Sequence, residues 1–246
     1  MENVTSTPKK MMKISELLSL SFKIYDNKFW SLIGLVLLPA LMMVAFILIF
    51  GLYFLLTTIL AKGAILSALI LVLVLLSLVA IAFLVIFSVL TKVALALVVR
   101  ENPSNFSIME MVKKAKQYWK GYFWIVFLGG LLTVLGFMVV IIPGIILAVY
   151  FSMATWIFFD HGTRGWAALK QSQAMVSGYW WAVFWRFALP MLILMFVLGL
   201  PSSFMEEKSA TYNAYSGFTQ IISMLLVPFF SAYAFNIYKN LKEIKA

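Results

Sequence analysis

Five ionisable residues lie within or beside the apolar segments of this 246-residue chain and could do chemistry there. They are Lys92, Asp160, His161, Arg164 and Arg186. Burying a charge in a membrane is expensive, so ionisable residues in apolar segments are candidates for a functional site. An ion pair of Asp160 with Arg164 or Arg186 is geometrically plausible. We favour a structural clamp over a reactive site, because long side chains near the membrane interface reach water cheaply.

The sequence argues against an enzyme. His161 is the only histidine and cysteine is absent, which removes thiol nucleophiles and cysteine-ligated metals. Histidine and acidic residues do not occur at metal-ligand spacing. No glycine-rich phosphate loop joins a strand to a helix, and no Ser-His-Asp set stands out. We therefore predict a protein with no metal and no cofactor.

Composition places the chain in a membrane. Hydrophobic residues make up 64% and charged residues 11%, against about 25% charged residues in soluble domains. Uncharged stretches run over 29–61, 63–91, 121–159, 187–205 and 209–238. A spanning helix needs about 20 apolar residues, and 121–159 is long enough for two, with a hairpin turn expected at Pro143-Gly144. This predicts an all-α polytopic membrane protein with six transmembrane helices.

The basic residues predict its orientation. Of the 19 lysines and arginines, only Lys62 and Lys208 fall on the side of the 61–63 turn and the 200–217 connection. The positive-inside rule makes the opposite, basic side cytoplasmic, and an even number of spans places both termini there. We predict a multi-pass protein of the plasma membrane. Because the charges line helix ends, the expected counterpart of the +10 net charge is anionic lipid and not nucleic acid.

A threefold repeat organises the chain. A helix-like segment, a pair of bulky aromatic residues and a long apolar run occur in this order three times. The pairs are Phe29-Trp30, Phe123-Trp124 and Trp180-Trp181. Aligning them without gaps also places Glu16 on Glu110 and Pro39 on Pro190. We interpret 14–100, 106–161 and 163–238 as three helix-hairpin units of a single membrane domain, 1–246.

Each unit begins with a predicted amphipathic helix, and Ser107-x-x-Glu110 is typical of a capping box that starts the second one. We expect these helices to lie in the cytoplasmic interface, with apolar faces in the acyl boundary and lysines toward headgroups. The candidate contacts to anionic lipid are Lys23, Lys28, Lys113, Lys114, Lys116, Lys120 and Lys170. Alternatively, the segments are plain connections that touch the bilayer, which we favour over specific recognition because interfacial anchors are common.

Pro39, Pro143 and Pro190 are candidate kinks. A proline within a span frees a backbone carbonyl, which is tolerated where neighbouring helices or water satisfy it. The equivalent positions of Pro39 and Pro190 resemble the interrupted helices that line transporter sites. Accommodation of packing is the simpler interpretation, because proline is frequent in membrane helices.

Part of the chain carries a family resemblance. The residues that carry it are Ile142-Pro143-Gly144-Ile145, Phe158-Phe159-Asp160, Ala168-Leu169-Lys170-Gln171-Ser172 and Gly178-Tyr179-Trp180-Trp181. With them, the stretch from Val139 to Arg186 resembles bacterial membrane proteins related to the membrane domain of glycerophosphoryl diester phosphodiesterases. The resemblance implies a six-span bundle with interface helices, in a family of largely unassigned activity. It does not imply phosphodiesterase activity, which in fused members is attributed to a separate soluble domain.

These observations lead to three functional hypotheses. The first is a non-enzymatic scaffold or accessory subunit that organises lipids or a membrane-protein partner at the cytoplasmic face. The alternative is a transporter or permease subunit, which a mid-membrane cavity between Pro39 and Pro190 would favour. The third is a membrane-embedded enzyme acting on lipid headgroups, which a pocket where Asp160, His161 and Arg186 converge would favour.

Overall fold

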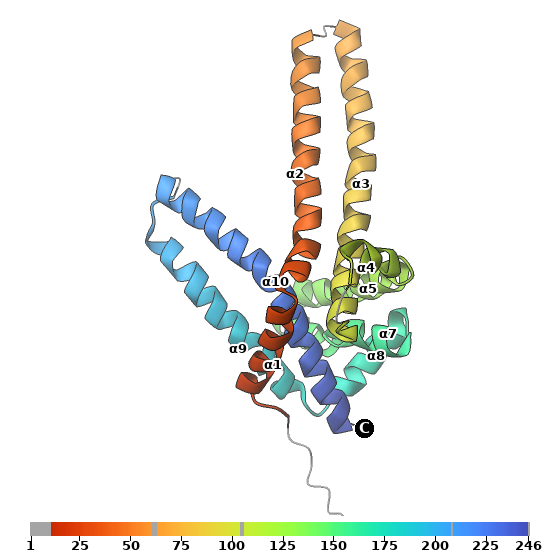
Figure 1. Ribbon diagram of the computed structural model, residues 1–246, viewed down its shortest axis with the longest axis vertical. Coiled ribbons are helices and arrows are strands. Elements are labelled where there is room, and N and C mark those ends of the chain that lie inside the picture. The colour runs from red at the N-terminus through yellow and green to blue at the C-terminus, as the bar shows by residue number, and fades with distance from the viewer. Residues whose placement is uncertain (1–10, 61–62, 104–105, 208, 246) are drawn as a thin grey trace, which may run out of the picture.

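The computed structural model describes residues 11–60, 63–103, 106–207 and 209–245, and these residues fold into helices joined by short connections (Figure 1). The helices are α1 (Ile14–Asn27), α2 (Phe29–Leu60), α3 (Gly63–Glu101), α4 (Ile108–Ala115), α5 (Trp119–Val139), α6 (Ile141–Phe151), α7 (Ala154–His161), α8 (Gly165–Val176), α9 (Trp180–Gly199), the 3-10 helix η1 (Leu200–Phe204) and α10 (Ala210–Lys245). The predicted all-α class is confirmed.

Within the described part of the chain, six helical stretches are long and apolar enough to cross a membrane. They are Phe29–Ile59, Ile65–Glu101, Trp119–Val139, Ile141–His161, Trp180–Phe204 and Ala210–Lys245. The fourth stretch joins α6 to α7. Each exceeds the roughly 20 residues that a bilayer requires. The six predicted spans are thereby confirmed as candidates by length and hydropathy.

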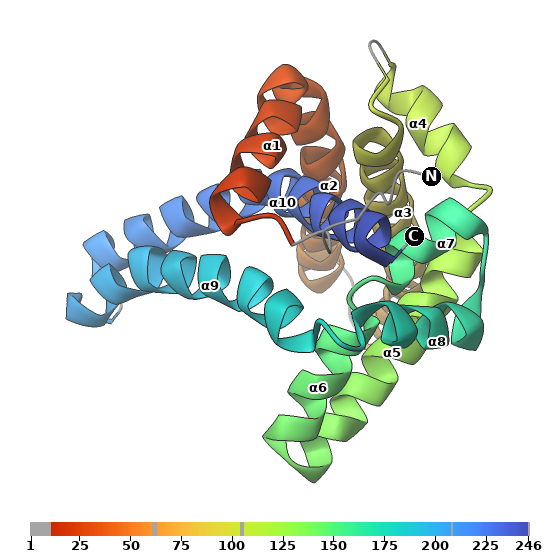
Figure 2. The ribbon, with the colours of Figure 1, turned by 90° about the horizontal axis from the view of Figure 1, so that it is seen from below.

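The long helices form three hairpins, α2–α3, α5–α6 and α9–α10, which leave a common region in different directions (Figures 1 and 2). We call this common region the base. It comprises α1, α4, α7, α8 and the C-terminal parts of α3 (90–101) and α10 (232–245). Away from the base the hairpins carry exposed apolar side chains, such as Leu48, Val79 and Met195. Such large apolar surfaces are unfavourable in water and suit contact with lipid.

The hydrophobic core of the protein lies in the base. On α3 every residue from Val93 to Val99 is buried, whereas the same helix is largely exposed between Leu71 and Ile86. Tyr233, Ile237 and Leu241 of α10 are also buried and belong to the same apolar cluster. Along their length, α3 and α10 therefore pass from the hairpins, where their apolar side chains are exposed, to the base, where they pack against other helices.

The three predicted amphipathic segments are helical, as α1, α4 and α8. One face of each helix is buried, with Leu17 and Ser21 on α1, Met111 and Ala115 on α4, and Ala168 and Ser172 on α8. We had expected these faces to enter the acyl boundary. In the structure they pack on neighbouring helices instead: α1 on α10, α4 on α3, and α8 on α5, α6 and α7. This packing removes their apolar surface from water.

The turn between the third and fourth spans lies earlier than expected. The chain is extended at Val140, and α6 begins at Ile141, so Pro143 sits in the first turn of α6 and not in the loop. A proline ring clashes with the carbonyl four residues before it, here that of Val139, where α5 ends. Its missing N–H is harmless there, because the first turn of a helix leaves its N–H groups unpaired.

Close approach of glycines holds the α5–α6 hairpin together. A Cβ atom built at Gly136 would lie 3.0 Å from the Gly144 Cα atom. The two backbones therefore meet where neither residue carries a side chain, as small residues allow in membrane helices. Pro39 and Pro190 lie inside α2 and α9, and both helices continue through them.

Candidate functional site

Asp160, at the end of α7, ties three helices of the base together. Its Oδ2 atom accepts a hydrogen bond of 2.8 Å from the Tyr238 hydroxyl and another from the Lys242 ammonium, both on α10. Its Oδ1 atom lies 3.6 Å from Nη2 of Arg100 on α3. Gly162 ends α7 in the left-handed conformation, at φ +70°, which glycine adopts without strain. We call this set the Asp160 clamp.

The partners of Asp160 differ from those expected. Among the described residues, the carboxylate pairs with Arg100 and Lys242 and not with Arg164 or Arg186. His161 is exposed, with Nε2 3.9 Å from Oδ2 of Asp160. The reason is the packing of the ends of α3 and α10 around α7, which brings in residues distant in sequence. The Asp160 clamp joins α7 to α3 and α10.

Arg186, on α9, binds Met12, which lies two residues before α1. Its Nε and Nη2 atoms donate to the Met12 carbonyl at 3.2 and 2.6 Å, and Nη1 donates to the Ala182 carbonyl at 2.9 Å. The Met12 N–H donates to Oδ1 of Asn240 at 2.9 Å. The Tyr233 hydroxyl donates to the Arg186 carbonyl at 2.8 Å. We call this set the Arg186 clamp, because it attaches the start of α1 to α9 and α10.

Polar side chains also join α1 to α10 along their contact. The Ser21 hydroxyl is fully buried, donates to the Leu17 carbonyl at 2.6 Å and accepts from Nδ2 of Asn236 at 2.9 Å. Nearer the hairpin, the Tyr25 hydroxyl donates to the Leu225 carbonyl at 3.0 Å. Buried polar groups that are satisfied in this way fix one arrangement of the helices.

The candidate lipid contacts fall into two groups. Some lysines are engaged within the protein: Lys28 donates to the Pro103 carbonyl, Lys114 pairs with Glu101 at 2.6 Å, and Lys120 lies over the Trp119 ring. Partial burial lowers the pKa of Lys28 from its ordinary value. The others are exposed and form no ion pair with a described residue. They are Lys23, Lys113, Lys116 and Lys170.

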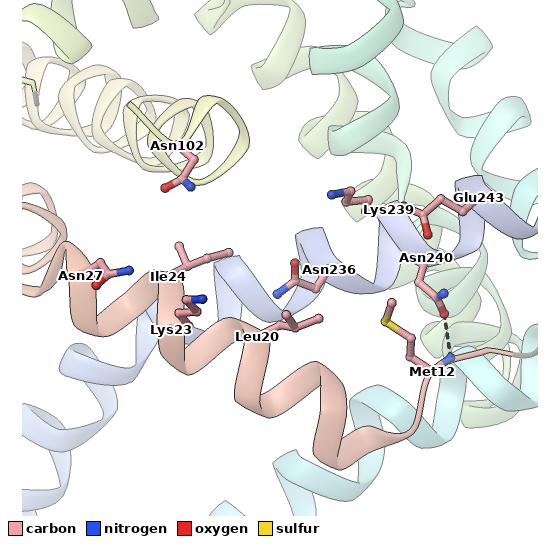
Figure 3. A pocket seen from close by; sticks show the side chains of 10 residues that line it. All are labelled: Met12, Leu20, Lys23, Ile24, Asn27, Asn102, Asn236, Lys239, Asn240 and Glu243. Carbon is pink, nitrogen blue, oxygen red and sulfur yellow. Dashed lines mark hydrogen bonds between the residues drawn. The ribbon is translucent and has the colours of Figure 1, made fainter. Parts of the chain in front are cut away.

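A polar pocket of about 260 Å³ opens between α1, α10 and the end of α3 (Figure 3). Its polar lining residues are Lys23 and Asn27 of α1, Asn102 after α3, and Asn236, Lys239, Asn240 and Glu243 of α10. Sequence reasoning missed this pocket, because its walls come from segments up to two hundred residues apart. One signal was present: residues 236, 239, 240 and 243 recur at the spacing of a single helix face.

An apolar groove of about 360 Å³ lies on the other side of α1, against α9 and α10. Pro190 lines it together with Leu18, Leu194, Phe229 and other apolar residues, and Pro39 is not among its lining residues. The two prolines therefore do not face each other across this groove. His161 lines a separate shallow pocket with Gln171 and Lys245, so the structure does not bring Asp160, His161 and Arg186 into one site.

The remaining candidates, Lys92 and Arg164, are both exposed. No group of three or more histidine or acidic residues among those the structure describes could hold a metal ion. What the geometry brings together is two structural clamps and, beside them, one polar pocket with lysines in its wall. The pocket is the candidate binding site.

These features define the class of protein: a polytopic helical membrane protein with six candidate spans. Comparison with protein-family models, with curated proteins and with solved structures finds no match to this chain. The resemblance of residues 139–186 to a known family therefore stays a prediction. The function has to be argued from the residues of the base.

Proposed function

We propose that this protein is a non-enzymatic membrane scaffold or accessory subunit that gathers anionic lipids around its base. The observation that carries the proposal is that lysines on the short helices α4 and α8 are exposed and lack ion-pair partners among the described residues. Lys113, Lys116 and Lys170 are exposed and unpaired among the described residues, whereas the carboxylates of Asp160 and Glu101 are engaged with cations of the protein. Exposed lysines near a membrane surface attract anionic headgroups.

Exposed apolar residues on the same helices support an interfacial position. Phe22 of α1, Met109 of α4 and Trp166 of α8 are 60%, 59% and 51% exposed. Large apolar side chains beside lysines are typical of helices that lie at the boundary between headgroups and acyl chains. In this arrangement the inner face of each helix packs on the protein, and its outer edge contacts lipid.

The two other functional hypotheses draw less support. The groove beside Pro190 is lined by apolar side chains, which offer no polar path for an ion or a polar substrate. Asp160 and Arg186 are both held in structural clamps, so neither is free to act on a headgroup. A scaffold of this kind could organise a membrane-protein partner instead of lipid, and quantifying both the lipids and the proteins that stay bound separates the two roles.

The proposal places the base, with both termini, in the cytoplasm, since nearly all basic residues belong to that side. The chain lacks cysteine, so single cysteines report topology directly. In intact cells, a membrane-impermeant thiol reagent should label Ser203→Cys, at the tip of α9–α10, and should label Lys113→Cys only after permeabilisation. Lys62 and Lys208, the two lysines assigned to the outer side, lie outside the described residues. Labelling of Lys113→Cys in intact cells would reverse the orientation.

Lipid enrichment tests the function. The full chain is extracted into polymer-bounded native discs, and the lipids and proteins that remain with it are quantified. We expect enrichment of anionic lipid over the bulk membrane. The triple substitution Lys113→Gln, Lys116→Gln and Lys170→Gln should return the composition toward bulk, because each lysine near an anionic surface contributes about 1 kcal/mol.

The matched control for the triple variant is the pair Glu101→Gln with Lys114→Gln, which removes one ion pair at unchanged net charge. This control should keep the enrichment of the wild-type protein. Wild-type discs with bulk lipid composition would refute the lipid form of the proposal. A membrane protein retained in fixed proportion, in such discs, would support the partner form instead.

A further inference from the structure

Two lysines face the polar pocket, and its lining offers them one carboxylate, that of Glu243. Lys23 reaches it from α1 and Lys239 from α10, on opposite sides of the pocket (Figure 3). Neither forms an ion pair with a described residue. Like charges that share one pocket repel each other, and an anion placed between them relieves the repulsion. The pocket is therefore suited to a negatively charged group.

Four asparagine amides complete the wall, and two of them are held in place. Nδ2 of Asn236 donates to the Ser21 hydroxyl, and Oδ1 of Asn240 accepts from the Met12 N–H. The opposite ends, Oδ1 of Asn236 and Nδ2 of Asn240, make no hydrogen bond to a described residue. An amide offers both donors and acceptors, so the fixed pair can bind a hydroxyl or a phosphate oxygen without reorganising.

The charges of the lining residues select the anion. Lys23, Lys239 and Glu243 together give the pocket a net charge of one positive unit. A phosphodiester carries one negative charge, whereas a phosphate monoester carries about −1.5 to −2 at pH 7. Glu243 would repel the second charge of a monoester, but it can accept a hydrogen bond from a hydroxyl or ammonium group on the alcohol of a diester.

The size and setting of the pocket fit a headgroup. Its volume of about 260 Å³ lies just below the 300 to 1,000 Å³ of typical small-molecule sites. Met12, Leu20 and Ile24 add apolar lining, and Leu20 is 43% exposed, so it can contact the glycerol and first acyl carbons. We propose that this pocket binds one phosphodiester group whose alcohol carries a hydroxyl or ammonium donor. This inference rests on the proposed lipid function and names a specific site for it.

The test uses the full chain, purified in detergent, depleted of lipid and examined by native mass spectrometry. The probes are phosphatidylglycerol and a diacylglycerol with the same acyl chains. We expect one tightly bound phosphatidylglycerol and no comparable binding of diacylglycerol. Lys23→Gln or Lys239→Gln should each weaken that binding by about fivefold. Lys92→Gln, which replaces an exposed lysine of α3 outside the pocket, should leave it unchanged.

Two further measurements identify the anion and its source. Glu243→Gln raises the charge of the pocket and should improve competition by inorganic phosphate, which the native pocket should bind weakly. Competition by the water-soluble, deacylated headgroup at concentrations close to those of the lipid would indicate a soluble phosphodiester, and its absence would indicate the membrane lipid.

The pocket proposal fails if the Lys23→Gln and Lys239→Gln double variant binds phosphatidylglycerol as the wild type does, or if diacylglycerol binds equally well. Thermal unfolding of both single variants should match the wild type, because neither lysine forms a hydrogen bond or ion pair with the part of the chain that the structure describes. If the double variant loses the single tightly bound phosphatidylglycerol but keeps the lipid enrichment in native discs, the pocket is a site separate from the exposed lysines. If the double variant keeps both the single bound phosphatidylglycerol and the lipid enrichment, the pocket proposal is refuted and the proposed function is not affected.

Discussion

Replacing Asp160 by asparagine should lower the free energy of unfolding by about 2 kcal/mol, the largest effect that we expect from a single polar substitution in the base. The carboxylate accepts hydrogen bonds from Tyr238 and Lys242 and lies 3.6 Å from the Arg100 guanidinium. Asparagine keeps the shape but removes the charge, so two cations of neighbouring helices then face each other without an anion. Its side chain is 24% exposed, which keeps the loss below that of a fully buried pair.

Glu101→Gln is the matched control for Asp160→Asn. Glu101 forms an ion pair of 2.6 Å with Lys114, but the two side chains are 29% and 42% exposed. Exposed pairs contribute about 0 to 1 kcal/mol, so Glu101→Gln should change stability little. Reversible unfolding in detergent, followed by circular dichroism, measures both variants. Equal losses for the two substitutions would contradict the role assigned to the Asp160 clamp.

Replacing Arg186 by methionine should loosen the attachment of α1 to α9 and α10. The guanidinium donates two hydrogen bonds to the Met12 carbonyl, and methionine has a similar length but no donor. Hydrogen bonds to charged groups contribute about 1.5 to 3 kcal/mol. Hydrogen exchange at the amides of α1 should therefore speed up by roughly tenfold to a hundredfold, while exchange in α7 and α8 should change little.

Two further substitutions sharpen this test. Arg186→Lys keeps the charge but loses the forked geometry, so exchange in α1 should lie between that of the wild type and that of Arg186→Met. Arg164→Met removes an exposed arginine from the same side of the protein and should leave exchange in α1 unchanged. Protection of α1 that survives Arg186→Met would show that Ser21, Asn236 and the apolar contacts of α1 hold the helix on their own.

Hydropathy predicted the six candidate spans, and the helical spacing of apolar residues predicted the three short helices. This is possible because a span depends on a local property, the length of an uncharged apolar run, that no distant residue can change. The aromatic pairs likewise mark helix starts close to where α2, α5 and α9 begin. Ser107 lies at the N-cap position of α4 as predicted, but its side chain forms no cap hydrogen bond, so the capping box itself is not formed. The turn at Val140 was missed by three residues, because Pro143 ends the helix before it instead of bending the chain at its own position.

The sequence by itself determined the membrane class, the candidate spans and the positions of the three short helices. Tertiary structure alone decided that Asp160 binds α3 and α10, that Arg186 holds Met12, and that asparagines and lysines of α1 and α10 share one pocket. The physical reason is that hydropathy is a property of each side chain by itself, whereas the partner of a polar group depends on how distant helices are rotated and packed. That packing places Met12 beside Asn240, 228 positions along the chain.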